Sequence, residues 1–326
     1  MVSLRFCLAT ALFLFLISYS FAGQSAAVSL DRDRSVYAHY LTGALLDNAN
    51  QSEAALKEFE QARQFDPDSD AINLRIAIDY IKLNENKKAV EQLNKALELN
   101  PDNLQARTLL AFLYTAQGEF SLAEIQYELI LKQAVKEDPE DLDVHNLLGQ
   151  FYFQQRKFDK ALEQFKLILE KDSKYKMAKL FIGLVYDEQG LRPQAIKVFK
   201  EILAVQPDDA DALNALGYIY AESGENLDEA QSLILKALKI DAKNGAYVDS
   251  LGWVYFKKGD FKKAREKLEE AIFLTQDPII FDHLGDTYLK LGDKSKAKEA
   301  WQKALKIKSN DEKTVEEIQG KIDKLK

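Results

Sequence analysis

Small and bulky apolar positions recur along the chain about every 34 residues, and polar or charged residues fill most of the sequence between them. Each recurrence begins with Gly or Ala, and in most of them an aromatic residue follows three positions later. An Ala comes about twelve positions after the first small residue, with a bulky apolar residue four positions beyond it. Because steps of three and four residues place side chains on one face of a helix, each recurrence predicts two amphipathic helices joined by a turn.

Eight blocks share this pattern. The first small position holds Gly43, Ala77, Ala111, Gly149, Gly183, Gly217, Gly252 and Gly285. The aromatic position holds Leu46 in the first block and then Tyr80, Tyr114, Tyr152, Tyr186, Tyr220, Tyr255 and Tyr288. The second small position holds Ala55, Ala89, Ala123, Ala161, Ala195, Ala230, Ala264 and Ala297. The bulky position after it holds Phe59, Leu93, Tyr127, Phe165, Phe199, Ile234, Leu268 and Trp301.

The small positions indicate how the two helices of a block pack. Helices approach closely only where side chains are small, so we expect the Gly and Ala positions at the crossing and the bulky positions beside it. Prolines near the ends of several blocks, Pro67, Pro101 and Pro207, are expected to stop the second helix. One helix pair cannot bury its apolar face alone, so neighbouring blocks must stack on one another.

This pattern resembles the tetratricopeptide repeat, whose units carry Leu-Gly at positions 7 and 8, Tyr at 11, Ala at 20, Phe at 24 and Pro at 32. Clear examples are "SLGWVYFKKGDFKKA" at 250–264 and "HLGDTYLKLGDKSKA" at 283–297. The resemblance covers nearly all of residues 36–311 and implies an all-α fold, a right-handed solenoid of helix pairs. The predicted units are 36–69, 70–103, 104–141, 142–175, 176–209, 210–244, 245–277 and 278–311.

Two further segments depart from the regular repeat. The third unit carries about four extra residues near 132–141, which predicts a lengthened second helix or a bulged turn. After the last unit, residues 312–326 place four apolar residues on one helical stripe and predict a C-terminal capping helix. These residues are Val315, Ile318, Ile322 and Leu325.

The first residues have the features of a secretory leader. Arg5 precedes an apolar run, Phe6 to Ile17, and small residues at Ser20 and Ala22 predict cleavage before Gly23. We therefore expect a signal peptide at 1–22, a short lead-in at 23–35, and an exported or periplasmic protein. The alternative is an uncleaved leader that anchors the chain in the inner membrane through residues 6–22, since that run is near the lower length limit for a membrane span.

Composition and charge narrow the function. The net charge of −8 argues against nonspecific binding of nucleic acid. The one cysteine, Cys7, lies in the leader, so the mature chain is expected to have no disulfide and no thiol nucleophile. Lysines cluster around 257–263, but Asp260 and Glu266 are interspersed, which favours a solvated face over a site for anionic lipids.

No pattern in the chain predicts catalysis. His39, His145 and His283 are far apart, and the sequence has no paired histidines, Gly-rich phosphate loop or Gly-x-Ser-x-Gly motif. We therefore expect no enzyme activity, no cofactor and no metal site.

The resemblance places a partner groove on first-helix positions 2, 5, 9, 12 and 13 of each unit. No unit has Lys at position 5 or Asn at position 9, so a clamp for a partner's C-terminal carboxylate is not expected. Three units instead mix amide, acid and aromatic residues, which peptide grooves use as anchors. These candidates are Asn146, Gln150, Phe153, Asn214, Tyr218, Asp249, Trp253 and Phe256.

Two alternatives stay open for these residues. Trp253 and Phe256 could instead pack against the next repeat or in the interior of the superhelix.

The preferred function is a non-catalytic scaffold of the bacterial cell envelope that holds a peptide or protein partner in its groove. The alternative is a protein that binds an exported polysaccharide through Trp253, Tyr218 and the acidic residues.

Overall fold

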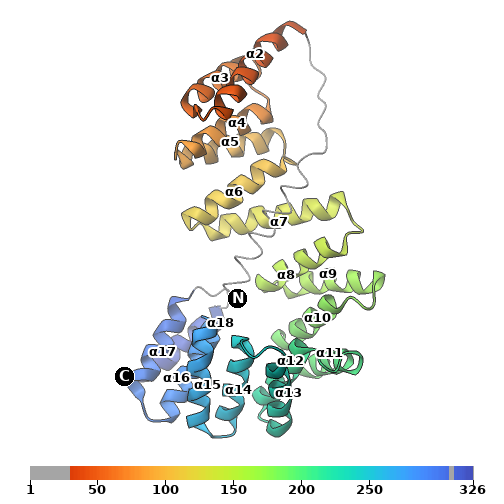
Figure 1. The fold of residues 1–326 in the computed structure, drawn as a ribbon, viewed down its shortest axis with the longest axis vertical. Coiled ribbons are helices and arrows are strands. Elements are labelled where there is room, and N and C mark those ends of the chain that lie inside the picture. The colour runs from red at the N-terminus through yellow and green to blue at the C-terminus, as the bar shows by residue number, and fades with distance from the viewer. Residues whose placement is uncertain (1–29, 308–311, 326) are drawn as a thin grey trace. The chain divides into compact units, whose positions relative to one another are not determined.

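The computed structural model describes residues 30–307 and 312–325, which form eight helix pairs and one final helix, with no strand in these ranges (Figure 1). The prediction of an all-α repeat fold is confirmed. In each pair we call the earlier helix the first and the later helix the second. The pairs are α2 (Leu30–Asn48) with α3 (Ser52–Phe65), α4 (Asp70–Lys82) with α5 (Asn86–Leu99), α6 (Leu104–Gln117) with α7 (Phe120–Glu137), α8 (Leu142–Gln154) with α9 (Phe158–Lys171), α10 (Lys176–Glu188) with α11 (Arg192–Val205), α12 (Ala210–Ser223) with α13 (Leu227–Ile240), α14 (Gly245–Lys257) with α15 (Phe261–Leu274), and α16 (Pro278–Lys290) with α17 (Lys294–Lys306).

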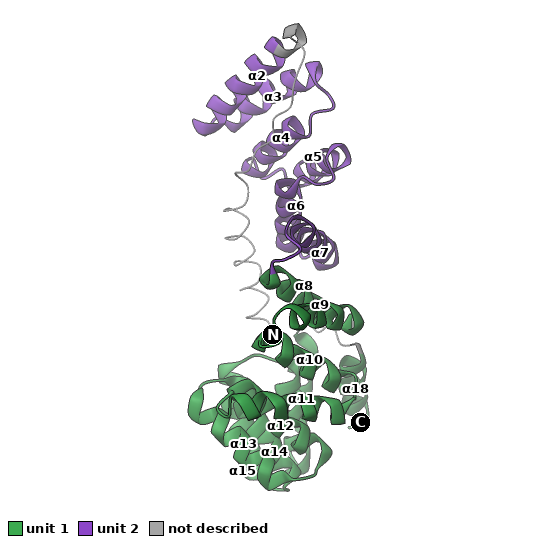
Figure 2. Ribbon diagram, turned by 90° about the vertical axis from the view of Figure 1, so that its right-hand side faces the viewer, with its two compact units in different colours: residues 1–5, 142–326 green, residues 6–141 purple. Residues whose placement is uncertain are grey.

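The described residues divide into two compact units, an N-terminal unit of residues 30–141 and a C-terminal unit of residues 142–325 (Figure 2). Helix α2 begins at Leu30, so the described part of the predicted lead-in is already helical. The predicted leader lies outside the described residues. The third pair has the lengthened second helix that the extra residues predicted, because α7 is 18 residues long.

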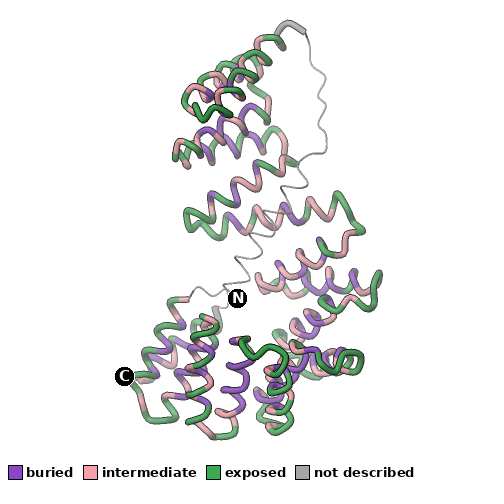
Figure 3. The backbone as a smooth tube through the Cα atoms, in the orientation of Figure 1, coloured by how far each residue is buried: buried purple, intermediate pink, exposed green. Residues whose placement is uncertain are grey.

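Buried and exposed residues alternate along the helix pairs of both units, as amphipathic helices require (Figure 3). The core of each pair forms where a small residue of the first helix meets a bulky residue of the second. A Cβ added to Gly183 would lie 2.6 Å from Cε1 of Phe199, and one added to Gly149 would lie 2.6 Å from Cε1 of Phe165. Both rings are completely buried. The glycines therefore let the two helices of a pair come so close that the phenylalanine ring of the second helix lies directly against the backbone of the first.

Side-chain caps and left-handed residues define the helix ends. The side chains of Asn103 and Asp209 accept hydrogen bonds from backbone N–H groups in the first turns of α6 and α12, at 3.0 and 2.9 Å. Gly118 closes α6 with a φ of +78°, a conformation that costs glycine little because it has no Cβ. These local signals set where α6 starts and stops and where α12 starts.

A pair of carboxyl groups joins the first two repeats. Asp79 of α4 is completely buried, and neither of its oxygens accepts a hydrogen bond from a donor group. Burial, together with the neighbouring carboxyl of Asp47 on α2, raises the pKa of Asp79 to about 7. Lys82 donates to Asp47 from the other side. Near neutral pH the Asp79 carboxyl is therefore protonated for much of the time.

Helix α18 (Glu312–Asp323) covers the end of the C-terminal unit, where the sequence predicts a capping helix. Ile318 and Ile322 are buried in a cluster with Phe281 and Trp301 of the last pair. Lys321 adds ion pairs to Asp282 at 2.7 Å and to Asp286 at 2.9 Å. Among residues 30–307 and 312–325, no helix combines the length and the apolar character that a membrane crossing would need.

The same Gly-to-Ala change should have opposite effects at a crossing and at an open helix position. Gly183→Ala should lower the free energy of unfolding by about 1–3 kcal/mol, because the new methyl group overlaps the fixed Phe199 ring. Gly320→Ala in α18 meets no atom within 4 Å and should raise it by up to about 1 kcal/mol through helix propensity. Urea unfolding of both variants measures this. If Gly183→Ala leaves the free energy of unfolding unchanged, the close packing of Gly183 against Phe199 is contradicted.

Candidate partner-binding surface

The eight residues that the sequence predicts for a groove all lie on first helices of the C-terminal unit. Asn146, Gln150 and Phe153 lie on α8, Asn214 and Tyr218 on α12, and Asp249, Trp253 and Phe256 on α14. We call the face of α8, α10, α12, α14 and α16 that carries these positions the first-helix surface. Six of the eight are half-buried, whereas Asp249 and Trp253 are buried.

Trp253 fills the junction between two repeats. Phe256 stacks on its indole with ring centroids 4.5 Å apart, and His283 of α16 stacks on it at 3.9 Å. The indole N–H donates to the carboxylate of Glu222 on α12. With only 7% of its surface exposed, Trp253 packs between repeats and offers almost no ring area to a partner.

Asp249 is held in the same junction by His283. Nδ1 of His283 lies 2.9 Å from Oδ1 of Asp249, and both side chains are buried. Burial alone would lower the pKa of His283, but the Asp249 carboxylate, together with Asp282 and Glu222, raises it above its ordinary value. The raised pKa favours the protonated, positively charged form of His283, which forms an ion pair with Asp249 and stacks on the Trp253 ring.

His283 is a residue that the sequence analysis assigned to no site. The sequence does indicate this contact, because His283 follows Asp249 by 34 residues, which is about one repeat length. In a stack with that period, residues one repeat apart occupy neighbouring positions, so an acid and a base at this spacing meet.

Tyr218 borders the same cluster, with its ring centroid 6.3 Å from that of His283. Burial raises the pKa of Tyr218 well above its ordinary value, and the carboxylates of Glu222 and Asp249 add to this effect. The hydroxyl group of Tyr218 therefore stays protonated and available as a hydrogen-bond donor. The structure thus brings Tyr218, Asp249, Trp253 and Phe256 together.

Acidic groups continue along this surface onto α10. Burial, together with the adjacent Glu188 carboxylate, raises the pKa of Asp187 to about 6. Arg192 and Lys257 balance part of this charge, with nitrogens 3.8 and 3.6 Å from the Glu222 carboxylate. The surface therefore carries both positive and negative charge. The Asp187 carboxyl gains a proton as the pH falls through about 6.

The three candidates on α8 are separated from the α12–α14 cluster by α10. Phe153 packs against Phe158 at 6.0 Å and Phe181 at 5.4 Å, so its ring serves the core between repeats. Asn146 and Asn214 share a different property. Each is the fifth residue of its first helix, and the Oδ1 atom of each is enclosed without a hydrogen-bond partner.

Unpaired amide oxygens of this kind are uncommon. Most buried polar atoms in folded proteins have a hydrogen-bond partner. A buried polar atom without one lowers the stability of the fold by about 1–3 kcal/mol. Both side chains are half-buried on the first-helix surface, although the Oδ1 atoms themselves are enclosed. The first-helix surface therefore has two repeated positions at which a ligand could complete a missing hydrogen bond.

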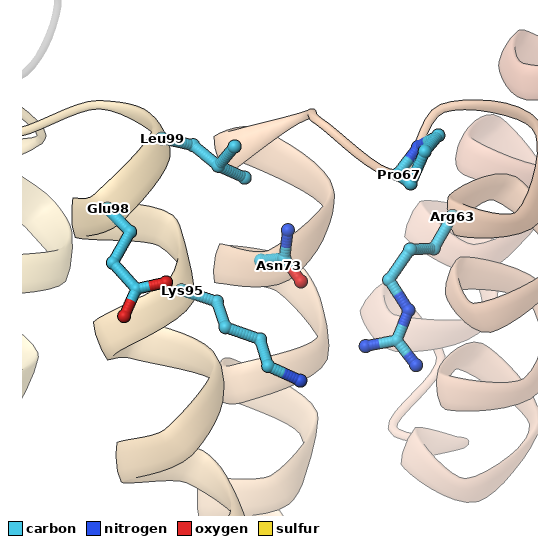
Figure 4. A pocket seen from close by; sticks show the side chains of 6 residues that line it. All are labelled: Arg63, Pro67, Asn73, Lys95, Glu98 and Leu99. Atoms are coloured by element: carbon cyan, nitrogen blue, oxygen red, sulfur yellow. The ribbon is translucent and has the colours of Figure 1, made fainter.

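A separate hollow of about 270 Å³ lies in the N-terminal unit (Figure 4). Its lining comes from α3, the turn after it, α4 and α5, and consists of Arg63, Pro67, Asn73, Lys95, Glu98 and Leu99. Arg63 already donates to Gln92, and Asn73 donates to the backbone of Ser69. None of the six lining residues is a serine, cysteine or histidine. The part of the chain that the structure describes contains no cluster of metal-ligating side chains.

The lysines around 257–263 take part in local pairs. Lys258 contacts Asp228 at 2.6 Å, and Lys263 contacts Asp260 at 2.9 Å. These neighbours reduce the positive charge that an anionic surface would meet.

Comparison with known families finds three matching segments. The family model described as "Psidin, N-terminal TPR repeats region" matches residues 151–269, that described as "TPR repeat" matches 79–118, and that described as "Tetratricopeptide repeat" matches 278–311. Both units of the structure therefore contain matched segments.

Curated relatives are similar over parts of their length. A TPR repeat-containing protein of Pseudomonas aeruginosa is 39% identical over 79 residues, which are 24% of this chain and 13% of that protein. DnaJ homolog subfamily C member 3 of Rattus norvegicus is 25% identical over 81% of this chain and 47% of its own length. A human protein O-mannosyl-transferase is 25% identical over 73% of this chain and 26% of its own. The chain spans less than half the length of each of these relatives.

Solved structures with a similar chain path include a thermophilic TPR protein of Thermus thermophilus, with 22% identity and a TM-score of 0.49. The similarity covers 55% of this chain and 97% of that one. A tetratricopeptide repeat protein of Parabacteroides merdae has 17% identity and a TM-score of 0.43 over 88% of this chain and 98% of its own.

The junction of Asp249 and His283 predicts that stability depends on pH. The folded pKa of His283 lies above the 6.5 of the unfolded chain, so its stabilisation is complete below about pH 6.5 and is lost as the pH rises through the folded value. His283→Gln should lower the free energy of unfolding by about 1–3 kcal/mol at pH 6 and remove this pH dependence. Thermal melts followed by tryptophan emission measure both effects, because Trp253 stacks on His283.

Asp249→Asn is the matched variant for this test. Removing the carboxylate takes away the main cause of the raised pKa of His283 and leaves burial, which lowers that pKa, so the pH dependence should reverse and stability should fall as the pH falls. If both variants keep the pH profile of the parent chain, the two groups do not interact as described.

Proposed function

Because the chain belongs to the tetratricopeptide repeat family, we propose that it is a non-catalytic scaffold that holds a protein or peptide partner on its first-helix surface, in the bacterial cell envelope. Repeats of this family generally mediate contacts between proteins. Their stacked first helices present equivalent positions at regular spacing, which suits an extended segment.

One observation carries the choice of surface. Asn146 and Asn214 occupy the same position of two first helices, and each has an enclosed amide oxygen without a hydrogen-bond partner. The main chain of an extended peptide carries donors along its whole length, and a peptide segment is therefore suited to complete these bonds. Half-buried Tyr218 and Gln150 add side-chain groups able to donate on the same surface.

The contacts of Trp253 favour a protein partner over the polysaccharide alternative. Sugar binding by an aromatic residue needs an open ring face, but Phe256 and His283 both stack on this indole. Asp249, the acid beside it, is paired with His283. Of the groups that suggested a glycan, Trp253 and Asp249 therefore support the fold instead.

The proposal assigns no catalysis to the chain. One relative is named as a mannosyl-transferase, but this chain matches only 26% of it at 25% identity. On the first-helix surface, the histidine that could act as an acid or base, His283, is engaged with Asp249 in a contact between repeats. Such a contact serves the packing of one repeat on the next.

Changing the two unpaired amides should separate binding from folding. The double variant Asn146→Leu with Asn214→Leu removes two unmet hydrogen bonds, so its melting temperature should stay equal or rise. Retention of the partner from a native envelope fraction should fall about tenfold, which corresponds to about 1.4 kcal/mol. Quantitative mass spectrometry of the retained proteins measures this.

Asn94→Leu is the matched control, because Asn94 is an exposed amide on the second helix α5. It should retain the same partner at the level of the parent chain. Full retention by the double variant, with its fold intact, would show that the partner binds elsewhere.

The proposed location rests on the apolar run from Phe6 to Ile17 and the small residues before Gly23. When the full chain is expressed in a bacterium, its exported form should begin at Gly23, as an intact-mass measurement would show. Ala22→Arg should block this cleavage and retain the leader. A parent chain found in the membrane fraction with residues 1–22 still attached would favour the anchored alternative instead.

A further inference from the structure

A buried carboxyl group occupies a position of the repeat that is otherwise apolar. Asp79 is the tenth residue of α4, and none of its surface is exposed. The tenth residue of every first helix from α6 to α16 is also buried, and all but the last are apolar. These residues are Leu113, Phe151, Val185, Ile219, Val254 and Thr287. The hydroxyl group of Thr287 donates to the backbone carbonyl of His283 at 2.8 Å, so its polarity is satisfied within its own helix.

The carboxyl group of Asp79 has no comparable partner. Neither of its oxygens meets a hydrogen-bond donor among the described residues. An ionised carboxylate that leaves water without a donor or a cation of its own strongly destabilises the folded state, so such a group keeps its proton. The geometry therefore favours a neutral Asp79 when the repeats are stacked.

The neighbouring charges strengthen this preference. Asp47 of α2 is the second carboxyl group at the junction, is 7% exposed and accepts a hydrogen bond from Lys82. Arg75, the other cation that acts on Asp79, donates to the hydroxyl group of Tyr40 at 3.2 Å. Each cation is therefore engaged with a different group, and Asp79 is left beside the Asp47 carboxylate.

The helices packed on α4 bury no titratable group among their described residues. These helices are α3 and α5. Their buried side chains are Ala55, Phe59, Ala62, Ala89, Gln92, Leu93 and Ala96. Of the charged residues on α3, Glu58 pairs with His39 at 2.7 Å, and Arg63 donates to Gln92 at 2.9 Å. The electrostatics around Asp79 therefore depend on Asp47, Lys82 and Arg75.

Asp47 and Asp79 lie on opposite sides of the contact between the first two repeats. Phe59 of α3 packs with Ile72 and Ile76 of α4 in the apolar part of this contact. While Asp79 is protonated, the apolar packing is not opposed by charge. When Asp79 loses its proton, two carboxylates lie beside one another in a buried place, and separation of the repeats returns both to water.

We propose that the contact between the first two repeats is a pH-sensitive junction, in which α2 and α3 stay docked on α4 while Asp79 is protonated and detach when Asp79 is ionised. Acid therefore tightens the first repeat, and a rise to neutral pH loosens it. The junction lies within the N-terminal unit and is independent of the first-helix surface of the C-terminal unit.

The sign and the pH range follow from proton binding. Burial, together with Asp47, raises the pKa of Asp79 to about 7, whereas an aspartate in water has a pKa of about 3.9. Between these values the docked form holds a proton that the detached form releases. The ratio of detached to docked chains should therefore rise about tenfold for each pH unit from about 4 to 7 and level off above about 7.

Hydrogen exchange of the full chain, followed by mass spectrometry at pH 5, 6, 7 and 8, tests the junction. A detached helix pair cannot bury its apolar face alone, so its amide protons exchange with solvent. After division by the exchange rate of an unfolded peptide at the same pH, exchange of α2 and α3 should rise at least tenfold from pH 5 to 7. Exchange of α6 and α7 should not follow.

Two substitutions of Asp79 separate its titration from its packing. Asp79→Asn keeps the shape without the charge, and Asp79→Leu supplies the residue that α6 has at this position. Both should remove the pH dependence of exchange in α2 and α3, and Asp79→Leu should keep their protection high at pH 8. Asp68→Asn, at an exposed acid in the turn between α3 and α4, is the matched control and should keep the parent profile.

Two results would overturn the proposal. The first is an Asp79→Asn chain that still loses the protection of α2 and α3 between pH 5 and 7 as the parent does, because Asp79 would then not be the titrating group. The second is a parent chain in which α6 and α7 lose protection together with α2 and α3, because the whole unit would then unfold and the junction would not open by itself.

Discussion

The close crossing of two helices at a residue without a bulky side chain is the contact on which the rest of the structure depends. At Gly183 and Gly149 the neighbouring helix presents a buried phenylalanine ring at a distance that leaves no room for a methyl group. This contact sets the separation of the two helices in a pair, and the separation sets which side chains the next pair can bury. Repetition of one local contact therefore builds the core of each unit from neighbouring helices alone.

Stacking at a fixed period also decides which polar groups meet. Asp249 and His283 are 34 residues apart and form a buried pair, and Asp47 and Lys82, 35 residues apart, form an ion pair between the first two repeats. Trp253 reaches Glu222, 31 residues earlier. The polar network of the first helices thus ties consecutive repeats together, whereas the amide oxygens of Asn146 and Asn214 have no hydrogen-bond partner.

The fold could be predicted from the sequence because its determinants are local. Small, aromatic and proline residues at fixed spacing identify the helices, their crossing and their ends, and the extra residues of the third unit predicted the long α7. The site could be predicted only in part. Position within the repeat placed all eight candidates on first helices, but the burial of Trp253 depends on His283 from the next repeat. Such relations between repeats are not visible in the pattern of a single unit.

The central claim is that the first-helix surface of the C-terminal unit is where a partner is held. The most direct measurement places a photo-cross-linking amino acid at Gln150, half-buried on α8, and separately at Lys236, exposed on α13, and irradiates each in intact cells. The account predicts one dominant cross-linked protein from position 150 and none from position 236. Equal cross-linking from both positions, or cross-linking from position 236 alone, would contradict it.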